Sequence, residues 1–324
     1  MVNNTDRAIE LMNEYGRIKK PFLFIIDFEK LKPIVLPVSQ LKENDIFFSI
    51  NDNTDPKFQY ELIFKKYPID YDVYKNAFEY VSNQIANGYS YLTNLTFPTR
   101  IDTNLTLQQI FKYSNAKYKL LVGDKFVVFS PECFVKIAGG IISSYPMKGT
   151  IDASIPNAEQ VILNDEKELA EHYTIVDLIR NDLSIVASDV SVEKFRYIEK
   201  ITTNDKSLLQ VSSKITGRVG ENFNEHLGDI IFAMLPAGSI SGAPKKKTVE
   251  IIKEAEKNKR GYYTGVFGYY DGEMLDSAVM IRFIENTSDG MFYRSGGGIT
   301  FMSNSEIEYN ELIDKVYVPV NRSN

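Results

Sequence analysis

The strand patterns of this chain come in clusters instead of alternating one by one with helices, and this restricts the fold more than any other feature. Residues 21–68 hold four short strand patterns rich in β-branched and aromatic residues. A run of hairpins is predicted at 119–150, punctuated by Gly-Asp and Gly-Gly pairs, and another hairpin turns near Asp271-Gly272. Such clusters favour an antiparallel α+β architecture over a doubly wound one.

Helical patterns fall between these clusters. A polar helix is predicted over residues 1–19, an amphipathic helix over 73–88, and a further helix after Thr106. Residues 190–231 are interpreted as connecting structure that contains one strand at 210–219. No internal repeat or long linker interrupts the 324 residues, which suffice for a substantial core.

Composition excludes several classes of function. The net charge of −6 argues against nucleic acid or an anionic membrane as the main partner. Cys133 is the only cysteine, which excludes an internal disulfide and a cysteine-rich metal site. The sequence shows no signal peptide and no apolar run long enough to span a bilayer. These features predict a soluble cytoplasmic protein.

A loop of small residues precedes a helical pattern at 245–257, with Pro244 expected at the first helical position. Glycines let a backbone approach a ligand closely, and a helix start attracts anions, so this loop is a candidate site for a carboxylate or phosphate. A plain strand-to-helix connection with three solvated lysines is the alternative. A nucleotide-binding loop is excluded because Ala243 and Pro244 stand between the second glycine and Lys245. The small residues are Gly238, Ser239, Ser241, Gly242 and Ala243.

The helix predicted over 164–184 carries the first of two glutamate pairs. Glu168 and Glu171 are three residues apart, so they share a face and are candidates to bind a hard cation together. Asp165 is the expected helix cap, and Asp165 with Glu168 is also an ordinary helix-start pattern. An apolar stripe is expected at Leu169, Tyr173, Val176, Ile179 and Leu183.

The second pair, Glu308 and Glu311, lies in a helical pattern near the end of the chain. Here too there are structural alternatives, namely a capping box of Ser305 with Glu308 and a surface ion pair of Glu311 with Lys315. If the fold brings the two pairs together, four carboxylates face one pocket and require a cation to neutralise them. Glutamate oxygens with open water positions suit Mg²⁺.

Other residues have a structural and a functional interpretation. Lys148 is expected in a tight turn, either as a solvated lysine or as a partly desolvated amine able to act as nucleophile or base. Glu132 is a routine turn carboxylate unless something pairs with it. Arg282, expected at the centre of an apolar strand, needs an anionic partner there. The three glycines at 296–298 indicate close approach either of a ligand or of another strand.

Several motifs together resemble the chorismate-utilising enzymes, which include anthranilate, aminodeoxychorismate, isochorismate and salicylate synthases. GSISGAPK is similar to the family's GSITGAPK, with Ser241 where threonine is usual. The segments EKELAEH, DLIRNDL, YTGVFGY, the IR of MIRFIE, SGGGI and ExxE…K occur in the family's order between about residues 120 and 318. The resemblance implies a single α+β chorismate-binding domain over 1–324 of two packed, mainly antiparallel sheets with helices outside. Its motif-bearing part is about 72–320, and 1–71 form a shortened N-terminal part.

The same resemblance implies roles for individual residues. Mg²⁺ would bind the ring carboxylate of chorismate and be held by Glu168, Glu171, Glu308 and Glu311. The residues implied to hold the substrate's carboxylates or to line its pocket are Arg282, Tyr263, Lys315, Gly297, Gly298, Ser241, Gly242 and Thr150.

PMKGT resembles the aminodeoxychorismate synthases, in which its lysine replaces an alanine of anthranilate synthases. The implied role of Lys148 is attack on ring carbon C2 as the C4 hydroxyl leaves, followed by displacement by ammonia that arrives at C4. Glu132 of SPECF matches the general acid and base. Leu92 stands where isochorismate-forming relatives carry a water-activating lysine, and leucine cannot activate water. Gln210 replaces a histidine that is associated with pyruvate elimination in anthranilate synthases.

The expected function is therefore Mg²⁺-dependent amination of chorismate to 4-amino-4-deoxychorismate for 4-aminobenzoate and folate synthesis. Anthranilate synthase component I, an isochorismate or salicylate synthase, and a non-catalytic chorismate-binding relative are the alternatives. Cys133 does not lie in a glycine-flanked elbow, so ammonia is expected from a separate glutamine amidotransferase subunit. Formation of 4-aminobenzoate would need another protein. No segment similar to the family's tryptophan site is found, which predicts no feedback inhibition by tryptophan.

Overall fold

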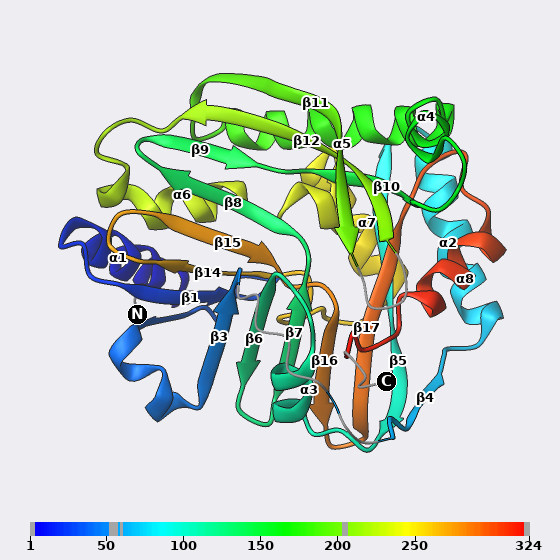
Figure 1. The fold of residues 1–324 in the computed structure, drawn as a ribbon, viewed down its shortest axis with the longest axis horizontal. Helices are drawn as coiled ribbons and strands as arrows, with labels where there is room; N and C mark the ends of the chain where they lie inside the picture. Colours follow the sequence, from blue (N-terminus) through cyan, green and yellow to red (C-terminus); the bar gives the residue numbers. More distant parts are fainter. Residues whose placement is uncertain (1–3, 52–57, 59–60, 203–206, 321–324) are drawn as a thin grey trace.

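The computed structural model describes residues 4–51, 58, 61–202 and 207–320, and its strands form two antiparallel sheets (Figure 1). The first sheet has nine strands, of which β11 (Ser188–Thr202) pairs only with β12. The other eight follow the order β10 (Met147–Asp152), β12 (Ser207–Arg218), β9 (Ile141–Ser144), β8 (Cys133–Ala138), β15 (Leu275–Val279), β14 (Val266–Tyr270), β1 (Phe22–Ile26) and β2 (Ile34–Pro37).

The second sheet has eight strands, with β4 (Phe64–Tyr67) paired to β5 at its side. The remaining seven follow the order β13 (Gly242–Ala243), β5 (Leu92–Thr103), β17 (Gly290–Ile299), β16 (Phe283–Thr287), β7 (Phe126–Ser130), β6 (Tyr118–Val122) and β3 (Ile46–Ile50). The predicted α+β fold of two mainly antiparallel sheets is thus confirmed.

Strand β1 shows how one short sequence builds two layers of core. Side chains alternate between the two faces of a strand. Phe22, Phe24 and Ile26 pack among the helices that cover the first sheet, whereas Leu23 and Ile25 pack between the two sheets. All five residues are buried, which explains why FLFII is a continuous apolar run instead of an alternating one.

The helices lie outside the two sheets, as predicted (Figure 1). The outer face of the first sheet is covered by α1 (Asn4–Arg17), α5 (Glu166–Ser184) and α6 (Leu227–Met234). The second sheet is covered by α2 (Tyr71–Ala86), α3 (Leu107–Tyr113), α7 (Lys245–Glu256) and α8 (Ser305–Asp314), and α4 (Ala158–Leu163) packs near β10. No helix in the described ranges is both long and apolar enough to cross a membrane.

The interpretation of 190–231 as connecting structure was wrong. Most of it forms the long β11–β12 hairpin, and Leu227–Met234 form α6. Most side chains of β11 are exposed or half-buried, so the strand lacks the apolar alternation that marks a strand in sequence. The apolar run of α6 is too short for its sequence to distinguish a buried helix from a strand. The glycine-rich loop therefore connects two helices.

Three smaller expectations were also wrong. Pro244 precedes α7 instead of beginning it, because β13 pairs with β5 and keeps the backbone extended up to this proline. Asn304 caps α8 in place of Ser305, since its side chain accepts bonds from the backbone N–H groups of Glu306 and Ile307. In the α5 stripe, Tyr173 is exposed, and its ring packs on Phe195 of β11 with centroids 4.9 Å apart.

Candidate active site

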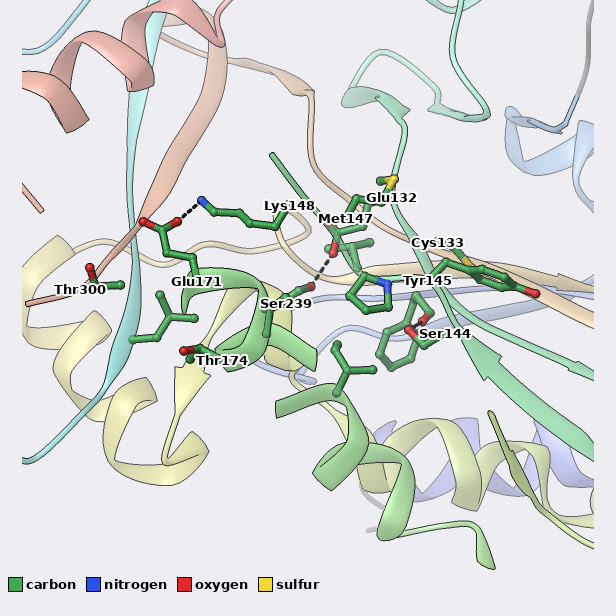
Figure 2. Close-up of a pocket in the computed structure, with 16 residues that line it drawn as sticks. Glu132, Cys133, Ser144, Tyr145, Met147, Lys148, Glu171, Thr174, Ser239 and Thr300 are labelled. Atoms are coloured by element: carbon green, nitrogen blue, oxygen red, sulfur yellow. Dashed lines mark hydrogen bonds and ion pairs between the residues drawn. The ribbon is translucent and has the colours of Figure 1, made fainter. Parts of the chain in front are cut away.

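Two neighbouring pockets lie where the β10 edge of the first sheet approaches the β5–β17 edge of the second. The lysine pocket, of about 130 Å³, is drawn in Figure 2; its lining includes Leu92, Glu132, Lys148, Glu171, Ser239 and Thr300. The lining of the arginine pocket, of about 180 Å³, includes Glu132, Ser239, Tyr263, Arg282, Tyr293, Gly297, Gly298 and Lys315. Glu132 and Ser239 line both pockets, so the two are parts of one site.

A β-bulge directs Lys148 into the lysine pocket. The pairing of β10 with β12 shifts register between Met147 and Thr150, and Gly149 has a φ of +90°. A bulge re-aims the side chain that it carries, so the expected tight turn is an irregularity within a strand. The Lys148 ammonium points toward Glu171 of α5, and its Nζ lies 2.6 Å from the Glu171 Oε2 (Figure 2).

Carboxylates hold this lysine in its charged form. Burial alone would lower the pKa of the Lys148 ammonium, but Glu171, Glu168 and Glu311 together raise that pKa above the ordinary value. Of the two interpretations offered by the sequence, the partly desolvated amine fits this position better than the solvated surface lysine. Lys148 must give up a proton before it can act as a nucleophile.

Glu132 has a partner, so it is more than a routine turn carboxylate. The Ser239 hydroxyl donates to the Glu132 Oε1 over 2.5 Å, as Figure 2 shows. Burial raises the pKa of the Glu132 carboxyl, and the Ser239 hydrogen bond and the Lys315 charge only partly oppose this. A carboxyl whose pKa is raised by burial stays protonated to higher pH and is suited to donate a proton.

The two glutamate pairs lie on different helices, α5 and α8, and each places a carboxylate against a glycine. An added Cβ on Gly149 would lie 3.0 Å from the Glu168 Oε2, and one on Gly297 would lie 3.2 Å from the Glu308 Oε2. The Glu168 and Glu308 carboxylates therefore occupy space that a side chain at Gly149 or Gly297 would need. Within the described ranges, no three His, Cys, Asp or Glu side chains stand close enough to form a metal-binding group.

Two lysines contribute positive charge among these glutamates. One is Lys148, and the other is Lys315, whose Nζ lies 2.6 Å from the Glu311 Oε1. The expected Glu311–Lys315 ion pair is thus confirmed. The carboxylate oxygens are hard ligands of the type that Mg²⁺ prefers, so the chemistry of the donor set fits the ion, and Mg²⁺ binding stays a prediction.

Arg282 lies at a bend and not at the centre of a strand as expected. It stands between β15 and β16 with a φ of 53°. Its Nη1 donates to the carbonyl of Lys315 over 2.8 Å, and its guanidinium lies 5.0 Å from the centre of the Tyr317 ring. No carboxylate in the described part of the chain pairs with Arg282. Its charge is therefore available for an anionic ligand.

The glycines at 296–298 have different neighbours, and the strand contact expected from the sequence is found at Gly296. A Cβ on Gly296 would lie 2.4 Å from the Leu95 carbonyl oxygen, so this glycine lets β17 pack closely on β5. Gly297 instead faces Glu308, Glu311 and Lys315. Tyr263 is buried in the same pocket, and burial raises the pKa of its phenol, which stays protonated.

The glycine-rich loop contributes to the site through Ser239, whereas Ser241 and Gly242 were the residues expected to line the pocket. Ser241 is buried and donates to the Ala237 carbonyl, and Gly242 pairs with β5. Neither of them lines the two pockets; Ser239 and Ile240 do. The motif GSISGAPK was the available signal, but it does not tell which of its two serines lines the pockets.

A buried ion pair fixes this loop to α5. The Lys245 Nζ lies 2.7 Å from the Asp182 Oδ1, and the Asp182 Oδ2 accepts the Gly238 N–H over 3.1 Å. Lys245 also donates to the Met234 carbonyl over 2.7 Å. Lys245 is therefore not one of three solvated lysines. This pair links the loop that carries Ser239 to the helix that carries Glu171.

Three further positions bear on the reaction. Leu92 on β5 lines the lysine pocket, and its Cδ1 would lie 2.9 Å from a Cβ on Gly298. Thr150 on β10 is exposed and lies opposite Gln210 of β12. Thr150 and Gln210 are absent from the lining of the two pockets, so no ligand contact of Thr150 is visible.

Comparison with protein families and with curated proteins finds matches that cover most of the chain. The model of the chorismate binding enzyme family matches residues 37–321. An "Uncharacterized PabA-like protein" of Haemophilus influenzae is 52% identical over 316 residues, which cover 96% of this chain and 96% of that protein. Aminodeoxychorismate synthase component 1 of Bacillus subtilis is 31% identical, covering 77% of this chain and 55% of its own length.

Anthranilate synthases are also similar, and so are solved structures. Anthranilate synthase component 1 of Mycobacterium bovis is 34% identical, with 75% of this chain and 50% of that protein covered. The structure of MenF, the menaquinone-specific isochorismate synthase of Escherichia coli, superposes with a TM-score of 0.71 at 16% identity. The superposition covers 97% of this chain and 81% of that one, and it shows a shared fold.

Proposed function

The chain belongs to the chorismate-binding enzymes, and we propose that it aminates chorismate with ammonia to 4-amino-4-deoxychorismate, a step toward 4-aminobenzoate and folate. The observation that carries the proposal is the position of Lys148 in the wall of a pocket that also contains Glu132. Glu132 is suited to protonate the departing C4 hydroxyl. The Lys148 amine would attack C2, and ammonia would then add at C4 as the amine leaves C2.

Neighbouring residues distinguish this reaction from the related ones. Leu92 lines the same pocket and cannot activate water, which disfavours the formation of isochorismate or salicylate. Lys148 and Gln210 disfavour an anthranilate synthase, for which an alanine and a histidine are expected at these positions. A non-catalytic relative has no reason to keep Lys148 together with four glutamates. Anthranilate synthase remains the alternative because such enzymes are among the similar proteins.

We propose that Mg²⁺ is the cofactor and is held by Glu168, Glu171, Glu308 and Glu311. When bound, the ion would supply the positive charge that binds the ring carboxylate of the substrate. Arg282, Tyr263, Lys315 and the backbone of Gly297 and Gly298 would hold the substrate's carboxylates from the arginine pocket.

Ammonia is proposed to come from a separate glutamine amidotransferase subunit. Cys133, the single cysteine, is buried, and burial raises the pKa of its thiol to about 12. Such a thiol is not ionised near neutral pH and is a poor nucleophile for glutamine hydrolysis. In vitro, ammonium salts should supply the ammonia in place of the amidotransferase subunit.

Replacing Lys148 by arginine tests the covalent role most sharply. Arginine keeps a positive charge beside Glu171, but it does not deprotonate and cannot attack the ring. We expect Lys148→Arg and Lys148→Ala to lose most amination with ammonium salt while chorismate binding, measured by calorimetry, is largely retained. If Lys148→Arg aminates at nearly the wild-type rate, Lys148 serves only as a charge and the covalent step is wrong.

A further inference from the structure

Tyr293 is a buried residue of the arginine pocket, and no prediction from the sequence included it. It lies on β17, opposite Thr99 of β5, and its side chain is fully buried. Its ring packs edge-on against Phe129 with centroids 6.0 Å apart. The ring thus belongs to the core outside the second sheet, while the residue also lines the pocket.

The hydroxyl of Tyr293 lies beside the guanidinium of Arg282, yet it makes no hydrogen bond of good geometry with any described residue. A guanidinium carries only N–H donors, so it cannot accept the phenolic proton. Burial raises the pKa of Tyr293, which keeps that proton in place at physiological pH. A buried donor without an acceptor costs free energy, and a phenylalanine of the same shape would avoid this cost.

The surroundings indicate which acceptor this proton fits. Arg282 is cationic and has no carboxylate partner within the described ranges, and Tyr263 contributes a protonated phenol. Lys315 adds an ammonium donor, whose charge is shared with Glu311. Donors and positive charge therefore converge on the arginine pocket. The complementary ligand is an anion with more than one acceptor oxygen, which is the chemistry of a carboxylate.

We propose that Tyr293 is a further substrate-binding residue, whose hydroxyl donates a hydrogen bond to the carboxylate that Arg282 holds. The inference rests on the proposed function, in which that carboxylate belongs to chorismate. Arg282 would neutralise the charge of the carboxylate, and the Tyr293 hydroxyl would donate its proton to one of the carboxylate oxygens. The cost of the unpaired hydroxyl in the free enzyme would then be recovered on binding.

The variant Tyr293→Phe removes the hydroxyl and keeps the ring. We expect its affinity for chorismate, measured by calorimetry with Mg²⁺ and without ammonium, to fall about 10- to 100-fold, as for a hydrogen bond to a charged group. The melting temperature of the free variant should be unchanged or higher, since no hydrogen bond is lost. The rise in melting temperature on addition of chorismate should be smaller than for the wild type.

Tyr270→Phe is the matched control. Tyr270 is also fully buried, but its hydroxyl donates to the Gly272 carbonyl over 2.7 Å, and neither residue lines the two pockets. This variant should melt at a lower temperature than the wild type and bind chorismate equally well.

Two outcomes would overturn the inference in different ways. If the wild type binds chorismate and Tyr293→Phe binds it equally well, Tyr293 has no part in recognition, whatever its effect on the melting temperature, and the proposed function is untouched. If the wild type itself does not bind chorismate, the proposed function fails and the role of Tyr293 fails with it.

Discussion

Replacing Glu256 by alanine should destabilise the protein far more than its sequence context indicates. Glu256 ends α7 and forms a two-armed ion pair with Arg260, with Nη2–Oε1 and Nε–Oε2 distances of 2.6 and 3.0 Å. The Glu256 and Arg260 side chains are only 4% and 2% exposed. The Glu256 Oε1 also accepts the backbone N–H and the hydroxyl of Thr96, over 2.9 and 3.0 Å.

Arg260 in turn joins two segments of the arginine pocket. Its Nη1 donates to the Ile240 carbonyl over 2.8 Å and its Nη2 to the Asn94 carbonyl over 2.7 Å. Removal of Glu256 leaves a buried guanidinium without an anionic partner, which costs about 3–5 kcal/mol. With an unfolding entropy of about 2.1 cal/mol/K per residue for 324 residues, this corresponds to a fall in Tm of about 4–7 °C.

The assay is thermal unfolding followed by calorimetry, with an exposed ion pair of the same spacing as control. Lys75 and Glu79 are 3.9 Å apart, and their side chains are 47% and 57% exposed. Glu79→Ala should change the free energy of unfolding by less than about 0.5 kcal/mol. The double variant Glu256→Met with Arg260→Met removes the unpaired guanidinium, but it also takes the acceptor from the Thr96 N–H and the donors from the Ile240 and Asn94 carbonyls, so it should recover only part of the loss of Glu256→Ala. Equal effects of Glu256→Ala and Glu79→Ala would refute this reasoning.

Two further predictions concern the site. Glu311→Gln should weaken Mg²⁺ binding, measured by calorimetry, and remove most Mg²⁺-dependent amination. The control Glu306→Gln, in the exposed first turn of α8, should change neither. If Glu311→Gln binds Mg²⁺ and aminates chorismate like the wild type, Glu311 is only the surface partner of Lys315. Ser239→Ala removes the donor that lowers the pKa of Glu132, so that pKa should rise further. Because a general acid is active when protonated, the alkaline limb of the pH profile of kcat/KM should move to higher pH; an unmoved limb would exclude Glu132 as the acid or Ser239 as its partner.

Much of the fold could be predicted because its signals are local. Turns and helix ends each depend on a few neighbouring residues. The structure contains the predicted hairpin turns at Gly139-Gly140 and Asp271-Gly272, the helix cap Asp165 and the glycine after α2. The exposed strand β11 was missed because a strand at the edge of a sheet needs no apolar face.

The contacts in and around the site could not be predicted because their partners, or the packing that buries them, involve segments far apart in the chain. Glu256 with Arg260 and Lys75 with Glu79 have the same spacing in sequence, and only the packing of α7 against β5 buries the first pair. The pairing of Lys148 with Glu171 likewise depends on a bulge in β10 opposite α5. The resemblance to a family supplied the candidate residues, whereas the contact of Ser239 with Glu132 and the position of Tyr293 became visible only in the structure.

The most direct test of the proposed function is the identity of the product. The purified protein would be incubated with chorismate, Mg²⁺ and ammonium salt, with and without an aminodeoxychorismate lyase, and the products identified by mass spectrometry. We expect 4-amino-4-deoxychorismate alone and 4-aminobenzoate when the lyase is present. Anthranilate, isochorismate or salicylate as the product would contradict the roles given to Lys148 and Leu92.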